Sequence, residues 1–491
     1  MKKILIANRG EIAVRVIRTC QKMGISTVAI YSEADRHSLH VQMADQAFCI
    51  GPAPSADSYL QGDKIIELCK KHQVDGIHPG YGFLSENADF VKKVTEAGIR
   101  FIGPSPESII LMGSKIASKQ AVAKFGVPLV PGINDAIEDV DEARKIADKI
   151  GYPILVKASA GGGGKGMRLV EDPAKLESSM KSAINEAVSS FGDGAVFIEK
   201  FVSKPRHIEI QIMADDHGQV VYLMERECSI QRRHQKLVEE APSAVLDADL
   251  RKRMGEAAVN VAKACNYSGA GTVEFLLDAS MEFYFLEMNT RLQVEHPVTE
   301  LITGLDLVEQ QIRVARGESL AYKQEDIQIN GHAIELRLCA EDPNNDFLPA
   351  VGTISTYKAP IDDFVRLDDF VYEGYEIPIY YDNMFGKLIV WGKDRMQAIE
   401  RMKYAINAFE IGGIANTLDF GRFVMNHEKF IDGDFDTNFI PNYFDPSAKD
   451  KEEEELMHAA ALFTYLESTQ RRDVVLPEHQ GDAWRSRKSK D

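Results

Sequence analysis

The stretch from Glu287 to Glu295 has the side chains with the clearest capacity for chemistry. Every second position in it is polar or charged: Glu287, Asn289, Arg291, Gln293 and Glu295. Residues two apart in an extended chain point to one face, so the pattern predicts a strand that presents two carboxylates, two amides and a guanidinium on one side. A polar face that simply meets water is the alternative, but it predicts Lys, Thr and Ser instead of two acids around an Arg.

An apolar run with one inserted acid, residues 271–278, precedes this stretch, and the short break between them predicts a hairpin. With a two-residue loop at 280–281, Glu274 lies directly opposite Glu287. Opposed side chains are roughly 4.5–5.5 Å apart, and like charges there are destabilising unless a divalent cation lies between them. Glu274, Glu287 and Asn289 are therefore candidate Mg²⁺ ligands, although a three-residue loop is expected to spoil the opposition.

A glycine-rich loop follows the strand predicted at residues 153–158. Residues 159–166 read Ser-Ala-Gly-Gly-Gly-Gly-Lys-Gly, and backbone N–H groups in such a loop can approach phosphate oxygens because no Cβ intervenes. The loop is not a Walker A motif, since Gly166 stands where Ser or Thr is required. A strand is predicted after it, so we expect a hairpin that closes over a nucleotide; a merely flexible turn is the alternative.

Further positions suggest a nucleotide and a small anion. Lys157 lies in an apolar strand and is expected to face an anion, unless it reaches the surface, and Lys115 opens a helix whose dipole attracts anions. Glu199 ends a strand and is a candidate contact for adenine at a hinge. His207 begins a strand with one polar face, and residues 231–236 form a basic cluster suited to phosphate. A solvated surface is the alternative for these last three.

The order of predicted elements indicates an α/β protein. A chain of 491 residues is too long for one hydrophobic core, so several domains are expected. Alternating strands and helices at the N-terminus predict a parallel, Rossmann-like sheet with ligands near residues 78–82. A mostly antiparallel α+β part is expected at the C-terminal end. The expected domains are residues 1–112, 113–330 with a lid lobe at about 131–203, 331–445, and a charged extension at 446–491. Strands are predicted at 3–7, 26–31, 47–50, 76–78, 153–158, 167–170 and 195–200, and helices at 12–23, 113–125, 138–149, 173–190, 395–409 and 454–467.

Composition narrows the class of protein. The net charge of −18 argues against nucleic-acid binding as the main activity, because a phosphate backbone needs a basic surface. The six cysteines form no CxxC pair, which suggests reduced thiols in the cytoplasm. No apolar run approaches membrane-spanning length, and the N-terminal apolar stretch is too short for a signal peptide. We expect a cytoplasmic protein without nucleic-acid or membrane partners.

Taken together, the motifs resemble the biotin carboxylase subunit of biotin-dependent carboxylases, a family of ATP-grasp enzymes, from Lys3 to about Tyr443. The matching segments are residues 7–13, 78–87, the glycine-rich loop, 206–209, 231–236 and 287–300. Ser114 departs from the family's pattern, which often has Asp before the lysine. The segment 381–388 departs from it at Asn383 and Phe385.

The resemblance implies a central ATP-grasp domain with a glycine-rich lid and a role for each matching residue. It implies ATP contacts by Lys115, Lys157, Gly163, Gly164, Glu199, Lys200, Val202, His207, Gln231, His234, Leu276 and Glu287. It implies a metal site at Glu274, Glu287 and Asn289, which the hairpin also selects, and bicarbonate binding by Lys236, Arg291, Gln293 and Val294. The implied biotin contacts are Tyr81, Gly82 and Arg337, and the implied catalytic residues are Glu295 as general base, Arg291, Lys236 and Arg337.

The implied activity is carboxylation of biotin by ATP and bicarbonate through carboxyphosphate, with Mg²⁺ or Mn²⁺. This is the first half-reaction of an acyl-CoA (acetyl or propionyl) or pyruvate carboxylase; the final acceptor stays open. The string at residues 401–404 lacks the second Met of the family's Met-Lys-Met biotin site, so the biotin carboxyl carrier protein and the carboxyltransferase are expected to be separate chains. A homodimer is also implied, and the tail at 446–491 is expected to dock partner subunits. The alternatives are another ATP-grasp ligase, in which an amine attacks an acyl phosphate, and a catalytically silent nucleotide-binding subunit.

Overall fold

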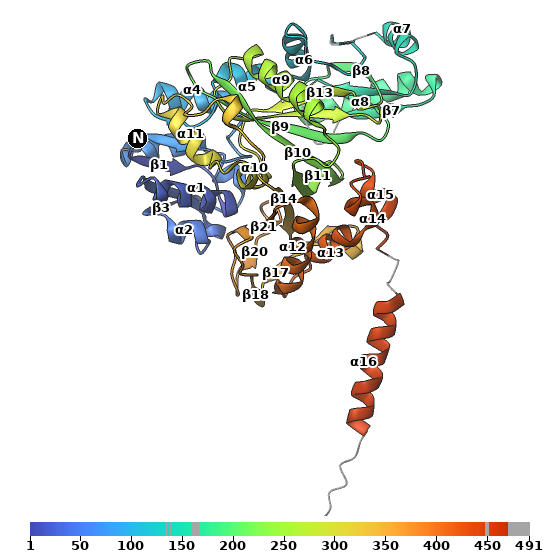
Figure 1. Cartoon of the computed structure of the whole chain (residues 1–491). Coiled ribbons are helices and arrows are strands. Elements are labelled where there is room, and N and C mark those ends of the chain that lie inside the picture. The colour runs from blue at the N-terminus through green and yellow to red at the C-terminus, as the bar shows by residue number, and fades with distance from the viewer. Residues whose placement is uncertain (134, 138, 160–165, 447–450, 470–491) are drawn as a thin grey trace, which may run out of the picture. The chain divides into compact units, whose positions relative to one another are not determined.

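The chain contains two units, Met1–Phe444 and Asp445–Asp491. The computed structural model describes residues 1–133, 135–137, 139–159, 166–446 and 451–469. Figure 1 follows the elements from the N-terminus in blue to the C-terminus in red. Every residue predicted to take part in chemistry belongs to the first unit.

A five-stranded parallel sheet forms the N-terminal part, as the sequence predicts. Its order is β3-β2-β1-β4-β5, and every neighbouring pair is parallel. Alternate residues of β1 pack into two different cores, Ile4 with α1 and Leu5 with α3 and α4, because helices cover both faces of the sheet. The strands are β1 (Lys3–Ile6), β2 (Ser26–Ser32), β3 (Gln46–Gly51), β4 (Gly76–His78) and β5 (Arg100–Phe101), and the helices are α1 (Gly10–Lys22), α2 (Leu39–Met43), α3 (Gly62–Lys71) and α4 (Ala88–Glu96).

The single helix predicted at 113–125 is wrong in its start, because two helices meet there. They are α5 (Pro106–Gly113) and α6 (Lys115–Ala123). Ser114 between them has an extended backbone, and its Oγ accepts the N–H of Ala117 at 3.3 Å, which caps α6. Lys115 is therefore the first residue of a helix, as predicted, and lies at its positive end.

The lid lobe is a small antiparallel sheet, β7-β6-β8, with two helices. Ile154 and Val156 of β6 point into its core, so Lys157 lies on the opposite face of the sheet. Residues 160–165 lie outside the described residues, and the predicted ATP contacts Gly163 and Gly164 are among them. The elements of the lobe are β6 (Ile154–Ala158), β7 (Met167–Val170), β8 (Val196–Lys200), α7 (Val140–Ile150) and α8 (Leu176–Phe191).

An eight-stranded antiparallel sheet joins the central and C-terminal parts. Its order is β13-β12-β9-β10-β11-β14-β21-β19, so it continues across the border predicted between residues 330 and 331 through the pairing of β11 with β14. Helix α9 packs on β9 and β10, and α12 packs on β14 and β21. The strands are β9 (Arg206–Ala214), β10 (Val220–Arg232), β11 (Gln235–Ala241), β12 (Gly269–Leu277), β13 (Phe283–Asn289), β14 (His332–Cys339), β19 (Val365–Asp369) and β21 (Met384–Gly392). The main helices are α9 (Ala248–Ala264), α10 (His296–Thr303), α11 (Leu307–Ala315), α12 (Arg395–Ala408) and α13 (Leu418–Asn426).

The hairpin of β12 and β13 places Glu274 opposite Glu287, but the predicted loop length is wrong. Asp278 N–H donates to the Glu282 carbonyl at 2.9 Å, so the loop has three residues instead of two. That register alone sets Glu274 opposite Leu286. A bulge directly beyond Glu274 adds one residue on β13 and restores the pair Glu274–Glu287.

The polar strand predicted through Glu295 ends at Asn289. The N–H and hydroxyl of Thr290 donate to Glu86 Oε1 at 3.0 and 3.1 Å, which takes the backbone out of the ladder. The chain then bends, and α10 begins at His296. A single polar face along residues 287–295 is therefore wrong, and tertiary contacts bring these side chains together instead.

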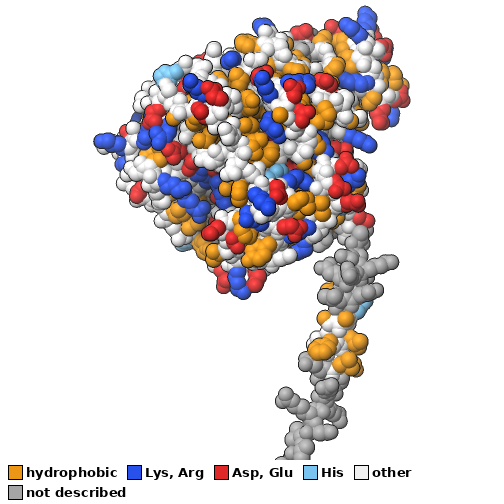
Figure 2. All heavy atoms as spheres, in the orientation of Figure 1, with side chains coloured by type: hydrophobic (Ala, Val, Ile, Leu, Met, Phe, Trp, Pro, Cys, Tyr) orange, Lys and Arg blue, Asp and Glu red, His pale blue; other side chains and the backbone are white. Residues whose placement is uncertain are grey.

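The second unit contains helix α16 (Lys451–Thr469), two to three residues longer at each end than the helix predicted at 454–467. Its exposed apolar side chains include Met457, Phe463 and Tyr465. No helix within the described ranges has both the length and the apolarity to cross a membrane. On the face shown in Figure 2, basic and acidic side chains of the first unit are intermingled.

Candidate active site

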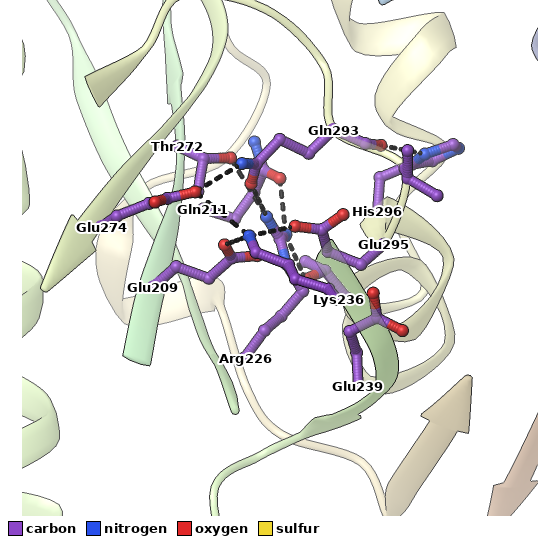
Figure 3. Close-up of polar contacts among 12 residues, drawn as sticks. Glu209, Gln211, Arg226, Lys236, Glu239, Thr272, Glu274, Gln293, Glu295 and His296 are labelled. Carbon is purple, nitrogen blue, oxygen red and sulfur yellow. Dashed lines mark hydrogen bonds and ion pairs between the residues drawn. The ribbon is translucent and has the colours of Figure 1, made fainter. Parts of the chain in front are cut away.

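Lys236 is the centre of a buried network of charges. It lies on β11 and is only 9 % exposed. Its Nζ contacts three carboxylates, those of Glu209 at 2.5 Å, Glu295 at 2.6 Å and Glu274 at 3.1 Å (Figure 3). Burial opposes its charge, but the three carboxylates outweigh burial and raise the pKa of Lys236 well above its usual value. Lys236 is therefore an ammonium ion at neutral pH.

Glu295, the predicted general base, is buried between two cations. Its Oε1 lies 2.6 Å from Lys236 Nζ and its Oε2 lies 2.8 Å from Arg337 Nη2. Burial opposes ionisation, but the two cations outweigh it and hold the pKa of Glu295 well below its usual value. Glu295 is therefore ionised, and removal of either cation would raise its pKa and make it a stronger base.

Arg337 on β14 also binds Glu239, with its Nε at 2.6 Å and Nη2 at 2.5 Å from Glu239 Oε1. Glu239 lies directly across the ladder from Glu335, and both are buried. Glu239, Glu295 and Glu335 surround one guanidinium, so they cannot all be charged. Burial raises the pKa of Glu239 to about 7 and that of Glu335 well above its usual value, so Glu335 is the acid that keeps its proton.

Arg226, on β10, is fully buried and is not among the residues predicted from the sequence. Its guanidinium donates to the side chains of Glu209, Gln211, Thr272, Gln293 and Thr299. The contact with Gln293 Oε1, at 2.9 Å, fixes the amide of a predicted bicarbonate ligand. Its sequence signal is weak, because a charged residue in a strand usually marks a solvated face.

The predicted metal ligands supply oxygen atoms, which Mg²⁺ prefers. Asn289 Nδ2 donates to Glu274 Oε1 at 2.9 Å, and Glu287, opposite Glu274 in the ladder, is bound by Lys115 at 3.0 Å. His207 Nε2 lies 3.1 Å from Glu274 Oε2. The oxygen-bearing side chains of Glu274, Glu287 and Asn289 fit a divalent cation.

Two groups of three possible metal-ligating side chains also occur in the described part of the chain. They are His207–Glu209–Glu274 and Glu209–Cys228–Glu295. Both depend on Glu209, whose oxygens already bind Arg226 and Lys236. These groups are thus parts of the charge network, and neither includes Glu287.

Three lysines converge where phosphates are expected. Lys157 Nζ lies 2.8 Å from Glu199, and Lys119 binds the same carboxylate. Burial and the neighbouring lysines lower the pKa of Lys119 to about 6 and that of Lys157 to about 8. Lys119 is therefore mostly neutral at neutral pH, and Lys115 and Lys157 are the cations of this cluster that suit a phosphate. Lys119 is not among the residues predicted from the sequence, although its position one turn after Lys115 on a predicted helix is a signal for it.

Lys157 thus faces an anion within the protein, and the Glu199 side chain is engaged by lysines; a contact of Glu199 with adenine stays a prediction. Lys200 Nζ donates to the carbonyls of Gly151 and Tyr152 at 2.8 and 3.1 Å. Val202 follows β8 and is partly exposed. These contacts place Lys200 at the base of the lid lobe.

The other predicted nucleotide contacts lie on β12, β9 and β10. Leu276 is opposite His207 across β12 and β9, and Gln231 is opposite Lys236 across β10 and β11. His234, in the turn between those strands, has a φ of 66°. Burial, His207 and Lys157 lower the pKa of His234, so His234 lies within electrostatic reach of the lysine cluster.

The predicted bicarbonate ligands reach the network by different routes. Gln293 Nε2 donates to Glu274 Oε1 at 2.9 Å, beside Lys236. Arg291 binds Glu86 through Nε at 2.9 Å and Asn289 through Nη2 at 3.2 Å. Glu86, which also accepts hydrogen bonds from Thr290, is not among the individual site residues predicted from the sequence.

Comparison with known proteins gives the family. A biotin carboxylase from a Nostoc strain is 54% identical to this chain over 438 residues, which are 89% of this chain and 98% of that one. This chain belongs to the biotin carboxylase family. Profiles described as the biotin carboxylase N-terminal domain, the ATP-binding domain of the carbamoyl-phosphate synthase L chain and the biotin carboxylase C-terminal domain match residues 1–109, 114–323 and 335–442.

Two further relatives are parts of larger carboxylases. The propionyl-CoA carboxylase alpha chain of Ruegeria pomeroyi is 54% identical over 458 residues, and the match covers 89% of this chain and 67% of that one. The biotin carboxylase domain of Hydrogenobacter thermophilus 2-oxoglutarate carboxylase superposes with a TM-score of 0.86 at 48% identity, covering 90% of this chain and 97% of that one. That domain was crystallised as a dimer with MgADP, ADP and bicarbonate.

The loop at residues 78–82 belongs to one of the segments that resemble biotin carboxylases, and Asn8 fixes its conformation. Its Nδ2 donates to the carbonyls of Pro79 and Tyr81, both at 2.7 Å. Gly82 has a φ of +68°, a conformation that favours glycine. Tyr81 donates its hydroxyl to Glu11 of α1, so the N-terminal motif and the loop form one structure.

Proposed function

We propose that this chain carboxylates biotin, carried on a separate protein, with ATP and bicarbonate. The observation that carries the proposal is the position of Lys236, 2.6 Å from Glu295 and 3.1 Å from Glu274. One ammonium ion thus joins the candidate general base to a candidate metal ligand. Gln293 also contacts Glu274, so a small anion that displaces these contacts meets a base and donors together.

In the first step, bicarbonate takes Lys236 and Arg291 as counter-ions, with Gln293 and the backbone of Val294 as further contacts. Lys236 thereby leaves Glu295, and Glu295 accepts the bicarbonate proton. A bicarbonate oxygen attacks the γ-phosphorus of ATP, which yields ADP and carboxyphosphate. Lys115 and Lys157 offset the charge that develops on the phosphates, and Lys119 adds an N–H donor beside them.

Mg²⁺ or Mn²⁺ held by Glu274, Glu287 and Asn289 would neutralise phosphate charge during this transfer. Lys115, bound to Glu287 at 3.0 Å, then turns toward the phosphates. His207 and Lys236 likewise give up Glu274. The same side chains thus serve as internal ion pairs before the substrates bind and as ligands afterwards.

In the second step, carboxyphosphate splits into CO₂ and phosphate, and the phosphate takes the ureido proton of biotin. The resulting enolate attacks CO₂ and needs a cation, the role we assign to Arg337. Proton uptake by Glu295 weakens its ion pair with Arg337, so the first step releases the guanidinium for the second. Tyr81 and Gly82 would contact biotin, and closure of the glycine-rich lid keeps water from carboxyphosphate.

Initial rates of ATP cleavage test the proposal. We expect cleavage that requires bicarbonate and that free biotin accelerates. Cleavage that requires ammonia or another amine instead would indicate the alternative ATP-grasp ligase, and no cleavage under either condition would indicate a silent subunit.

The wider context of the reaction belongs to the same proposal. The biotin carboxyl carrier protein and a carboxyltransferase are the partners, the chain acts as a homodimer in the cytoplasm, and the final acceptor is an acyl-CoA or pyruvate. The propionyl-CoA carboxylase alpha chain among its relatives supports an acyl-CoA acceptor, and the dimer of the 2-oxoglutarate carboxylase domain supports a homodimer. The catalytic parts are residues 1–112, 113–330 and 331–445, with 446–491 as a docking extension.

A further inference from the structure

Lys387 is a fully buried lysine for which the proposed reaction has no use. It lies on β21 and is 0% exposed. A buried ammonium ion is costly unless its protons meet acceptors. Its Nζ donates to the Val294 carbonyl at 2.9 Å and lies 3.2 Å from Glu11 Oε2 and 3.9 Å from Asp368 Oδ2.

Two of these three groups are the main partners of Lys387. Arg366 binds both oxygens of Asp368, at 3.1 and 2.7 Å, so Asp368 is already paired. Lys387 therefore serves chiefly Val294 and Glu11. It joins the turn before α10 to the first turn of α1, two segments far apart in the sequence.

The contact with Val294 bears directly on bicarbonate. Val294 has an apolar side chain, so only its backbone can serve an anion. Lys387 holds the carbonyl of the peptide group that links Val294 to Glu295. This contact therefore fixes both a proposed bicarbonate ligand and the backbone of the proposed general base.

The contact with Glu11 leads to the biotin side of the site. The second oxygen of Glu11 accepts the hydroxyl of Tyr81. A continuous chain thus runs from Tyr81 through Glu11 and Lys387 to Val294. It connects the loop assigned to biotin with the turn assigned to bicarbonate.

We propose that Lys387 is a positioning residue that couples biotin binding at Tyr81 to bicarbonate binding at Val294. The inference rests on the proposed function. A change at Tyr81 alters the hold of Glu11 on Lys387 and, through it, the Val294–Glu295 peptide. The charged and titratable groups that face Lys387 are Glu11 from α1, Asp368 from β19, Glu335 from β14 and His296 from α10.

These neighbours leave Glu11 as the charge partner of Lys387. Glu335 keeps its proton, and burial together with nearby cations lowers the pKa of His296 well below its usual value, so that imidazole is neutral. Burial raises the pKa of Glu11 to about 7 in spite of Lys387. Assays above that pH keep Glu11 ionised and the chain of contacts complete.

Three variants and a control separate the links of this chain. Lys387→Met removes the donor to Val294. Glu11→Gln keeps that donor and an acceptor for Tyr81 but ends the ion pair, and the double variant removes both buried charges together. Lys393→Met, at an exposed lysine just after β21, is the matched control.

The measurement is ATP cleavage against bicarbonate concentration, with and without saturating free biotin. In the unaltered protein, free biotin should lower the KM for bicarbonate. In Lys387→Met, that KM should rise about tenfold or more, the size of one lost hydrogen bond to a charged group, while the KM for Mg-ATP stays constant. In Glu11→Gln, the KM for bicarbonate measured without biotin should stay near that of the unaltered protein, but biotin should no longer lower it. Lys393→Met should change neither the KM for bicarbonate nor the effect of biotin on it.

A folded Lys387→Met protein with an unaltered KM for bicarbonate would overturn the inference, as would Glu11→Gln that keeps the full effect of biotin. If Lys387→Met does not fold, the double variant takes its place with the same expectation. If that variant also fails to fold, the effect of biotin on the KM for bicarbonate in Glu11→Gln is the test of the coupling. An unaltered protein whose ATP cleavage ignores bicarbonate refutes the proposed function and, with it, the basis of this inference.

Discussion

Replacement of Arg226 by Met is expected to destabilise the first unit and to weaken bicarbonate binding together. The Arg226 guanidinium is fully buried and donates to five side-chain oxygens, including Gln211 at 2.7 Å and Gln293 at 2.9 Å. Met has a similar length but no donor. Two amide oxygens and one oxygen of Glu209 therefore lose their partner inside the protein.

The size of the effect follows from these contacts. Removing one partner of a buried ion pair costs roughly 3–5 kcal/mol, and each unpaired buried polar group costs about 1–3 kcal/mol. Glu209 keeps Lys236 at 2.5 Å, which reduces the first of these costs. We therefore expect a loss of about 3–5 kcal/mol in the free energy of unfolding, a large part of the 5–15 kcal/mol typical of a domain. Arg226→Lys keeps the charge but fewer donors, so about 2 kcal/mol is expected for it.

The free energy of unfolding is measured by urea denaturation, with fluorescence as the signal. Bicarbonate binding is measured from the rate of ATP cleavage as a function of bicarbonate concentration. Because Gln293 loses the donor that fixes its amide, we expect the KM for bicarbonate to rise about tenfold. Arg144→Met is the control, since Arg144 is exposed on α7 and lies 3.5 Å from Asp141; it should change stability by less than about 1 kcal/mol. If Arg226→Met unfolds within about 1 kcal/mol of the unaltered protein, the view that Arg226 organises the buried network is wrong.

Three further predictions concern the metal, a buried acid and the tail. Glu274→Gln should lower ATP cleavage at fixed Mg²⁺ by about 100-fold or more, and chelation by EDTA should stop cleavage until Mg²⁺ or Mn²⁺ is restored; an unaltered rate would remove Glu274 from the metal site. Burial raises the pKa of Glu239 to about 7, so the folded protein holds this proton more tightly than the unfolded chain does. As the pH rises from the ordinary pKa of a glutamic acid to about 7, the unaltered protein should therefore lose stability relative to Glu239→Gln. Equal pH dependence of the two urea midpoints would contradict this. Deletion of residues 446–491 should spare carboxylation of free biotin and weaken co-purification with the carboxyltransferase, and full assembly of the shortened chain would refute a docking role.

Local patterns predicted the bounds of several elements well. The strands β4 and β7 and the helix α12 lie where the sequence places them, to within one residue. The hairpin shows the limit of this reasoning, because the predicted opposition of Glu274 and Glu287 is right while the predicted loop is wrong. A bulge compensates for the longer loop, and side-chain periodicity does not specify where a ladder admits an extra residue.

The eight-stranded sheet shows a second limit. The sequence predicts an antiparallel C-terminal part, but it does not show that β14 pairs with β11 of the central part. In the sequence, α9, β12, β13, α10 and α11 lie between these two strands. Their pairing brings Arg337 to Glu295. Such a long-range pairing depends on the complementarity of two sheet edges, which no local period records.

The sequence by itself determined which side chains have the chemistry of this family, because residue types and their spacing survive in any conformation of the chain. It named Lys236, Glu274 and Glu295 without knowledge of their neighbours. Only the tertiary structure decided which charges meet and which are neutral: the five contacts of Arg226, the lysine pair on Glu199 and the retained proton of Glu335. The physical reason is that the charge state and partner of an ionisable group depend on burial and on residues distant in the sequence, and folding alone brings these together.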